Sequence, residues 1–318
     1  MSGVFLDFAT VSYGGDLDPA ALHAALPDFV VHDLTAEAEV SERLAGRRVA
    51  AANKVEFTRA LMAAHPELRL IALAATGTNN VDLAAARELG IAVCNVREYC
   101  TASVVQHVFA VLLALTHGLR EYDRALKAGA WEFGGGENAQ AYPIRELAGL
   151  TLGIVGHGTL GKGVADVARA FGMQVLIASR AGQPPAPGRL ELDELLRRAD
   201  VLSLHCPLNA ATRNLIGARE IARMKPGAIL INTARGGLVD AAALAAALRA
   251  RHLGGAAVDV LVEEPPVHGS PLLAPDLGNL IVTPHTAWAA REARQRAVDE
   301  TAANIRDFLA GGQRGRVV

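Results

Sequence analysis

The sequence has few aromatic residues and few cysteines. Aromatic side chains make up 4% of the 318 residues, so aliphatic side chains and alanine must fill most of the core. The cysteines are an odd number without a CxxC pair, which argues against a disulfide framework and a zinc site; they are Cys94, Cys100 and Cys206. We therefore expect a reducing, cytoplasmic environment and no metal.

The sequence also lacks an excess of charge of one sign. Its 31 Lys and Arg residues and 33 Asp and Glu residues give a formal net charge of −2, and no basic run predicts contact with nucleic acid. The longest strongly apolar run, at 108–115, is too short to span a bilayer, and the N-terminus lacks the pattern of a signal peptide. The composition thus predicts a folded chain without a nucleic-acid or membrane partner.

Short aliphatic runs alternate with helix-like stretches along nearly the whole chain. The length predicts about two domains, and a glycine- and proline-containing segment at 131–149 separates two such alternations. We expect buried strands at 4–9, 28–34, 47–53, 68–75, 91–96, 150–156, 173–179, 200–206, 228–234, 256–260 and 280–284, and helices at 19–26, 82–89, 101–128, 241–248 and 289–310. This alternation predicts an α/β fold with two doubly wound parallel sheets.

The sequence GHGTLG at 156–161 lies between a predicted strand and a predicted helix. In that setting a GxGxxG motif indicates a dinucleotide site, whereas as a bare string it is weak evidence. Gly156 permits the tight turn, Gly158 lets the backbone approach a pyrophosphate, and Gly161 lets the helix pack on the strand. The first residues of the helix, Thr159 and Leu160, would meet the phosphates. The alternative is a glycine-rich turn without a ligand.

The next strand ends without the acidic residue that usually binds the adenosine ribose. An Asp or Glu there accepts hydrogen bonds from the 2′-hydroxyl and repels a 2′-phosphate, but this chain has Ser179 and Arg180. A guanidinium in this place pairs with a phosphate, so we predict that NADP(H) is preferred and that NAD(H) is a possible cofactor. If Arg180 instead points into solvent or stacks on the adenine, the enzyme would use both cofactors.

Three polar residues follow predicted strands of the second alternation: Arg235, Glu264 and His285. The carboxyl ends of parallel strands are where ligands bind. Arginine matches a carboxylate, histidine donates and accepts protons near neutral pH, and a carboxylate beside a histidine stabilises its charged form. Together they suit the reduction of a 2-oxo acid. Taken singly, each has an ordinary explanation as a surface charge or a hydrogen-bonded loop residue.

The stretches around these residues resemble a known family. The sequences IVGHGTLG, HCPLNAATRNLIG, MKPGAILINTARGGLVD, VDVLVEEPP and TPHTAW resemble, in order and spacing, motifs of the D-isomer-specific 2-hydroxyacid dehydrogenases. ATGTNNVD at 75–82 is similar to the substrate-binding loop of that family. The resemblance covers nearly the whole chain.

The resemblance implies roles for individual residues. Arg235 would bind substrate, His285 would be the acid/base, and Glu264 rather than Glu263 would pair with it, because Glu264 directly precedes a proline. The remaining cofactor residues would be His205, Cys206, Pro207, Thr212, Thr233, Ala234 and, at the nicotinamide carboxamide, Asp259. The substrate would meet Arg235, His285, the loop residues Thr76, Gly77, Thr78 and Asn79, and Trp288, for which a core position is an equal alternative.

The same resemblance implies the organisation of the chain. A substrate-binding domain would comprise 1–98 and 286–318, and a dinucleotide-binding Rossmann domain 99–285, with a closable cleft between them. Within the family, RELAGLTLGIVG, the SR dipeptide at 179–180 and TPHTAW resemble glycerate dehydrogenases that reduce hydroxypyruvate and glyoxylate. The apolar segment 103–115 would pack across a two-fold axis and give a homodimer. The alternative is a helix that is buried wholly within its own subunit.

Two other functions remain open. Non-catalytic corepressors share the scaffold and dinucleotide binding of these dehydrogenases, but this chain has little room for interaction tails. A dehydrogenase of the D-lactate or phosphoglycerate type is the second alternative, although the end of the chain at Val318 leaves no room for the regulatory domain of many phosphoglycerate dehydrogenases.

Overall fold

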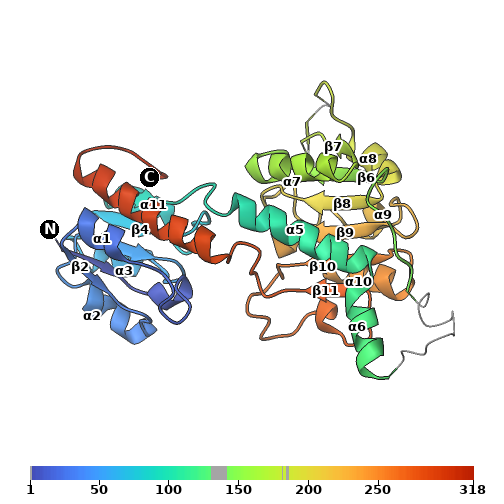
Figure 1. Cartoon of the computed structure of the whole chain (residues 1–318). Coiled ribbons are helices and arrows are strands. Elements are labelled where there is room, and N and C mark those ends of the chain that lie inside the picture. Colours follow the sequence, from blue (N-terminus) through green and yellow to red (C-terminus); the bar gives the residue numbers. More distant parts are fainter. Residues whose placement is uncertain (1, 130–141, 181, 184–185) are drawn as a thin grey trace. The chain divides into compact units, whose positions relative to one another are not determined.

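A computed structural model describes residues 2–129, 142–180, 182–183 and 186–318 and divides into two compact units (Figure 1). Unit 1 comprises residues 1–101 and 288–318, and unit 2 comprises residues 102–287. Each unit contains one parallel sheet covered by helices, as the alternation of strands and helices predicts. Most of the segment expected to separate the two alternations, at 131–149, lies outside the described residues.

The sheet of unit 1 has the order β2-β1-β3-β4-β5. Its strands are β1 (Ser2–Phe5), β2 (Asp28–Val31), β3 (Val49–Ala52), β4 (Leu70–Leu73) and β5 (Ala92–Cys94). One face is covered by α1 (Ala20–Ala25) and α11 (Arg291–Leu309), and the other by α2 (Val40–Leu44), α3 (Arg59–Ala63) and α4 (Leu83–Glu88). The 3-10 helices η1 (Phe8–Thr10) and η2 (Glu37–Glu39) complete the unit.

Burial on both faces explains the apolar runs of this sheet. In β3, Ala51 packs under α1 and α11, whereas its neighbours Ala50 and Ala52 pack under the helices of the opposite face. All four residues of β3 are buried, as expected for a strand between two helical layers. Thr58 and Asp82 cap α3 and α4 by accepting the N–H groups of the first turn, which fixes where these helices begin.

The sheet of unit 2 has the order β11-β10-β9-β8-β6-β7. Its strands are β6 (Thr151–Val155), β7 (Gln174–Ile177), β8 (Val201–Leu204), β9 (Ile229–Asn232), β10 (Gly255–Val258) and β11 (Leu280–Val282). Beyond β7, a single parallel bridge joins Ala178 to Leu190. Counting that bridge as a rudimentary strand, the seven strands have the order 3-2-1-4-5-6-7, and the first six of them follow the order of dinucleotide-binding sheets.

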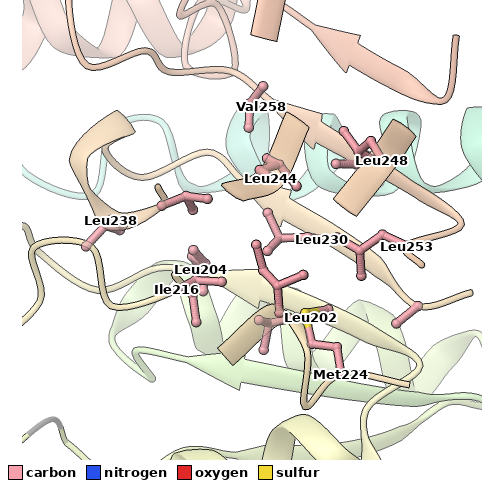
Figure 2. Packing of buried hydrophobic residues seen from close by; sticks show 14 of the residues in the cluster. Leu202, Leu204, Ile216, Met224, Leu230, Leu238, Leu244, Leu248, Leu253 and Val258 are labelled. Atoms are coloured by element: carbon pink, nitrogen blue, oxygen red, sulfur yellow. The ribbon is translucent and has the colours of Figure 1, made fainter. Parts of the chain in front are cut away.

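Helices cover both faces of this sheet as well. On one face lie α5 (Thr101–Thr116) and α7 (Thr159–Ala170), and on the other lie α8 (Leu192–Arg198), α9 (Ala218–Ile221) and α10 (Ala241–Arg249). Figure 2 shows the core of the second layer, a cluster that includes Leu244 and Leu248 of α10 and Leu202 and Leu230 of the strands. The unit also contains α6 (Leu119–Lys127), η3 (Gly236–Leu238) and η4 (Pro271–Leu273).

The single helix predicted for 101–128 is in fact two helices. Gly118 has a φ of 58°, a left-handed conformation that ends helices, and α6 leaves α5 at an angle of 56°. Among the described residues no single helix is long and apolar enough to span a membrane; only this bent pair together passes by length and composition.

The apolar segment of α5 is buried mainly within its own unit. Val108, Phe109 and Leu112 pack on strands β6, β8 and β9, and the small or polar residues Ala102, Gln106 and Ala110 face outward. Packing within unit 2 therefore explains much of the apolar character that predicted a subunit interface.

Candidate active site in unit 2

The glycine loop after β6 has the geometry of a phosphate-binding turn. Gly156 has a φ of 95°, and a Cβ there would lie 2.5 Å from the backbone N of Cys206. A Cβ on Gly161 would lie 2.1 Å from the carbonyl O of Gly156, so the helix packs directly on the turn. Gly158, by contrast, has open space around it and precedes the first residue of α7. A ligand phosphate would meet bare backbone and a helix N-terminus here.

Three buried polar atoms along the carboxyl edge of the sheet lack a hydrogen-bond partner. Among the described residues they are Ser179 Oγ, His205 Nδ1 and Thr233 Oγ1. Each follows a strand, respectively β7, β8 and β9. Buried polar atoms without a partner are rare in folded proteins because their desolvation costs about 1–3 kcal/mol each. Three in one row indicate that a polar ligand completes the site, and all three residues were predicted to contact a dinucleotide.

His205 is held as a neutral imidazole. Its Nε2 lies 2.8 Å from Ser203 Oγ, and burial lowers the pKa of His205 to about 4. The neighbouring predicted residues shape the loop that follows. Thr212 Oγ1 donates to the carbonyl of Pro207 at 2.7 Å, and burial raises the pKa of the Cys206 thiol. These side chains support the wall of the site, whereas Ser179, His205 and Thr233 offer polar atoms to it.

A second cation besides Arg180, Arg189, lies at the end of β7, and the sequence did not predict it. The side chain of Arg180 is exposed and makes no hydrogen bond or ion pair with the described residues. Arg189, beside the bridging residue Leu190, lies with Nη1 3.5 Å from the carbonyl O of Ala178. The pKa of His157 in the glycine loop is lowered by burial and then by the positive charge of Arg189. Only the rudimentary strand brings Arg189 here, and no sequence motif marks it.

Arg235 follows β9 in a loop fixed by its own neighbours. The side chain of the buried Asn232 donates to the carbonyl of Arg235 at 2.9 Å and accepts the N–H of Ala234 at 3.1 Å. A Cβ on Gly236 would lie 2.1 Å from the carbonyl C of Leu261, so the loop after β9 packs closely on the segment that leads to Glu264.

His285 and Glu264 form the pair that the sequence predicts. His285 Nδ1 lies 2.6 Å from Glu264 Oε2, and Glu264 Oε1 accepts the N–H of Leu261 at 2.8 Å. Each side chain is about one-third exposed, 33% for His285 and 35% for Glu264. The adjacent Glu263 instead contacts the exposed His268 at 2.6 Å. A carboxylate in contact with an imidazole is an arrangement that general acid–base catalysis uses.

The carboxylate of Asp259 accepts hydrogen bonds within the protein that the sequence does not predict. Its side chain is buried and accepts hydrogen bonds from Thr283, Thr286 and Ala287. The sequence suggested only a contact with the cofactor. The spacing between Asp259 and the TPHTA stretch gave no signal of this network.

In unit 1, the predicted substrate loop lies at the carboxyl edge of that sheet. Thr76 Oγ1 donates to the carbonyl of Val96 at 2.9 Å, and the side chain of Asn95 donates to the carbonyl of Thr76 at 2.7 Å. Within the described part of the chain, the N–H groups of residues 77–79 donate to no protein acceptor. They are therefore available to an anionic ligand.

Trp288 also belongs to unit 1, where it packs on the core. Its ring lies edge-on to Tyr99 at 6.3 Å, and both rings belong to a cluster with Ala293 and Ala297. Trp288 is only partly buried, so its packing fits the core alternative without excluding a substrate contact, which stays a prediction. Elsewhere, the described residues contain no group of three or more His, Cys, Asp or Glu side chains that could hold a metal ion.

Comparison with known proteins matches the segment that contains this site to a known family. The profile of the D-isomer specific 2-hydroxyacid dehydrogenase NAD-binding domain matches residues 109–287. A glycerate dehydrogenase from Methylorubrum extorquens is 45% identical over 86% of this chain and 86% of its own length. A hydroxypyruvate reductase from Blautia hydrogenotrophica is 36% identical over 93% of this chain and 94% of its own. The structure of an acyclic imino acid reductase with NADPH and D-Arg superimposes with a TM-score of 0.85 at 27% identity, covering 100% of both chains.

Proposed function

This chain belongs to the family of D-isomer-specific 2-hydroxyacid dehydrogenases, and from that premise we propose that it reduces small 2-oxo acids to D-2-hydroxy acids. Hydroxypyruvate and glyoxylate are the proposed substrates, and D-glycerate and glycolate the products. The observation that carries the proposal is the 2.6 Å pair of His285 and Glu264 on the carboxyl edge that also bears the glycine loop. An enzyme of this family needs a proton donor at that place.

Each of the proposed site residues has a separate role in the reaction. When bound, a reduced nicotinamide supplies the hydride that adds to the carbonyl carbon of the substrate. Arg235 holds the substrate carboxylate and polarises the carbonyl oxygen through its planar guanidinium. His285 donates a proton to that oxygen as the carbonyl group becomes an alcohol, and Glu264 holds the imidazole ring through its contact with Nδ1. The N–H groups of Gly77, Thr78 and Asn79 bind the carboxylate as well.

NADP(H) is the proposed cofactor, with NAD(H) as a weaker alternative. The support is the absence of an acidic residue after β7, the exposed guanidinium of Arg180 and the second cation, Arg189. A 2′-phosphate carries about two negative charges, and each charge-assisted hydrogen bond to it contributes roughly 1.5–3 kcal/mol. Ser179, whose Oγ is buried without a partner among the described residues, would donate to the same group.

The substrate class is proposed from the names of the relatives. The two curated relatives above are called glycerate dehydrogenase and hydroxypyruvate reductase, and a 38% identical protein from Aeropyrum pernix is called glyoxylate reductase. All three names refer to acids with a short side chain. Trp288 would limit the space beside such a side chain.

The domain roles and the assembly are also proposals. Unit 2 would bind the dinucleotide, and unit 1 would contribute the N–H groups of residues 77–79 to the binding of the substrate carboxylate. A homodimer is supported by large apolar side chains that unit 2 leaves exposed, namely Leu119 (56%) and Leu126 (43%) of α6 and Ile144 (57%). Light scattering would give about twice the chain mass of 33.3 kDa for a dimer, and the chain mass itself would contradict it. A cytoplasmic location rests on the cysteine content alone.

A substrate panel tests the proposed function. Purified protein is mixed with hydroxypyruvate, glyoxylate, pyruvate and 3-phosphohydroxypyruvate, each with NADPH and with NADH, and absorbance at 340 nm is followed. We expect the highest kcat/KM with hydroxypyruvate or glyoxylate. A preference for pyruvate or for the phosphorylated acid would favour the D-lactate or phosphoglycerate type. Binding of cofactor without turnover of any acid would favour the corepressor-like alternative.

A further inference from the structure

The backbone of His285 is strained, and the structure shows what holds it. Its φ is 54°, in the left-handed region that a non-glycine residue adopts at a cost of roughly 1–3 kcal/mol. Such a conformation persists only when the surroundings enforce it. The N–H of His285 donates to the carbonyl of Asp259 at 2.7 Å and to that of Thr283 at 3.0 Å. The catalytic ring is therefore aimed by its neighbours, not by its own preference.

The carboxylate of Asp259 anchors the chain on either side of His285. Oδ1 accepts the hydroxyl proton of Thr283 at 2.6 Å and the N–H of Thr286 at 2.8 Å, and Oδ2 accepts the N–H of Ala287 at 2.9 Å. Asp259 directly follows β10 and is 2% exposed, so the carboxylate depends on these donors for its stability. The segment 283–287, which carries His285, is thus wrapped around one buried anion.

Helix α5 holds the same segment from the other side. His107 Nε2 lies 3.3 Å from Thr283 Oγ1 and 3.9 Å from Asp259 Oδ1. Since the Thr283 hydroxyl donates its proton to Asp259, it accepts from His107, which fixes Nε2 as the protonated ring nitrogen. Ser103, four residues earlier and so on the same face of α5, donates to the carbonyl of Ala287 at 2.6 Å.

We propose that Asp259 and Thr283, held from α5 by His107, are positioning residues that fix the strained backbone of His285 so that its ring stays against Glu264. The proposal rests on the proposed function, in which His285 donates the proton. It differs from the role that the family resemblance implies for Asp259, a contact with the nicotinamide carboxamide. Three of the roughly four acceptor positions of this carboxylate are filled by the chain's own donors.

Thr283 offers the sharpest test because its replacements differ by single groups. Thr283→Val keeps the shape and removes the hydroxyl, whereas Thr283→Ser keeps the hydroxyl and removes a methyl group. His107→Leu and His107→Gln form a second pair, since a glutamine amide can replace the Nε2–H donor. Both pairs avoid changing the buried Asp259, whose replacement by Asn would place an N–H₂ group against a backbone N–H.

The experiment measures kcat and KM for hydroxypyruvate, the Kd of NADPH by fluorescence, and the solvent deuterium isotope effect on kcat. Turnover is expressed per titrated cofactor site, so that loss of folded protein does not count. We expect Thr283→Val to lower kcat by about tenfold, as the loss of one hydrogen bond to a charged group allows. The isotope effect should rise because proton transfer slows, and the Kd of NADPH should change by less than about twofold. Thr283→Ser and His107→Gln should restore most of the rate, and His107→Leu should lower it less than Thr283→Val.

Three results would overturn the proposal. An unchanged kcat in Thr283→Val would remove the hydroxyl from the mechanism. A weaker Kd for NADPH at unchanged kcat would assign the network to cofactor contact. Equal losses in Thr283→Val and Thr283→Ser would show a purely steric effect. An inactive wild type would contradict the proposed function as well, and it is distinguished from these results because all three require an active wild type.

Discussion

The two units share one topology and differ in what lies at the carboxyl edge of the sheet. In both, the strand order runs 2-1-3-4-5 from the edge strand, with a sixth strand in unit 2. In unit 1 the buried Asp7 at that edge is satisfied, because it accepts the N–H groups of Asn53, Lys54 and Val55 at 2.6–3.1 Å. In unit 2 the three partnerless polar atoms, all among the described residues, lie along the corresponding edge.

The difference shows that the shared topology places a ligand-binding edge in each unit, whereas the groups at that edge decide which ligand binds. Unit 1 offers backbone N–H groups in the loop at 77–79, which suit a small anion. Unit 2 combines bare backbone at Gly158, polar atoms after three strands and two cations beside β7, which suit an extended dinucleotide. The proposed proton donor, His285, lies in unit 2 as well. Changes at the two edges should therefore have separable effects.

The largest effect is expected from removing the catalytic ring. His285→Asn should lower kcat by at least about a hundredfold, the usual scale of general acid–base catalysis, with little change in cofactor affinity. His268→Asn is the matched control, because His268 pairs with Glu263 at the same 2.6 Å but is 85% exposed. Steady-state kinetics at saturating cofactor measures both. Near-normal turnover of His285→Asn would remove this residue from the mechanism.

The next effect concerns the cations at β7. Arg180→Ala should raise KM for NADPH by about tenfold or more, and KM for NADH much less, because a charge-assisted hydrogen bond to the 2′-phosphate is lost. Arg189→Gln should act in the same direction. Arg197→Gln, on the nearby helix α8, serves as a control for net charge. A wild type whose kcat/KM is higher with NADH would contradict the cofactor assignment.

Two glycines of one loop should separate stability from binding. Gly161→Ala places a Cβ 2.1 Å from the carbonyl of Gly156 and should destabilise the free protein by about 1–3 kcal/mol. Gly158→Ala meets open space in the protein and should leave the melting temperature of the free protein nearly unchanged. It should instead weaken NADPH binding, since the added methyl group faces the pyrophosphate. Thermal melts with and without NADPH give both values, and equal melting temperatures of the two free variants would contradict the packing argument.

The smallest effect is a pH dependence of stability that comes from His205. Burial lowers its pKa to about 4 in the folded chain, below the ordinary value of 6.5. Between these values the unfolded chain binds a proton that the folded chain excludes, so stability is full above pH 6.5 and falls by up to about 1.4 kcal/mol per pH unit on acidification. Denaturant unfolding between pH 6 and 5 should show a shallower dependence in His205→Gln. Parallel dependences in the two proteins would contradict a buried neutral His205.

The sequence predicts the fold well because the physical signals are local. All eleven predicted strands exist, since buried parallel strands read as short aliphatic runs between helices. The prediction of one helix over 101–128 was wrong at Gly118, because hydrophobic periodicity does not show where a single residue adopts a left-handed conformation. The glycine loop and the residues after the strands also follow from motifs. Arg189, the Asp259 network and its tie to His107 required the tertiary structure, because each depends on contacts between segments far apart in the chain.

The central claim is that this chain delivers a proton from His285 while a small 2-oxo acid is reduced. The most direct measurement mixes the wild-type protein with hydroxypyruvate and NADPH, follows absorbance at 340 nm, and determines the configuration of the product by chiral chromatography. The account predicts a steady loss of absorbance and formation of D-glycerate. No loss of absorbance, or formation of the L enantiomer, would contradict it.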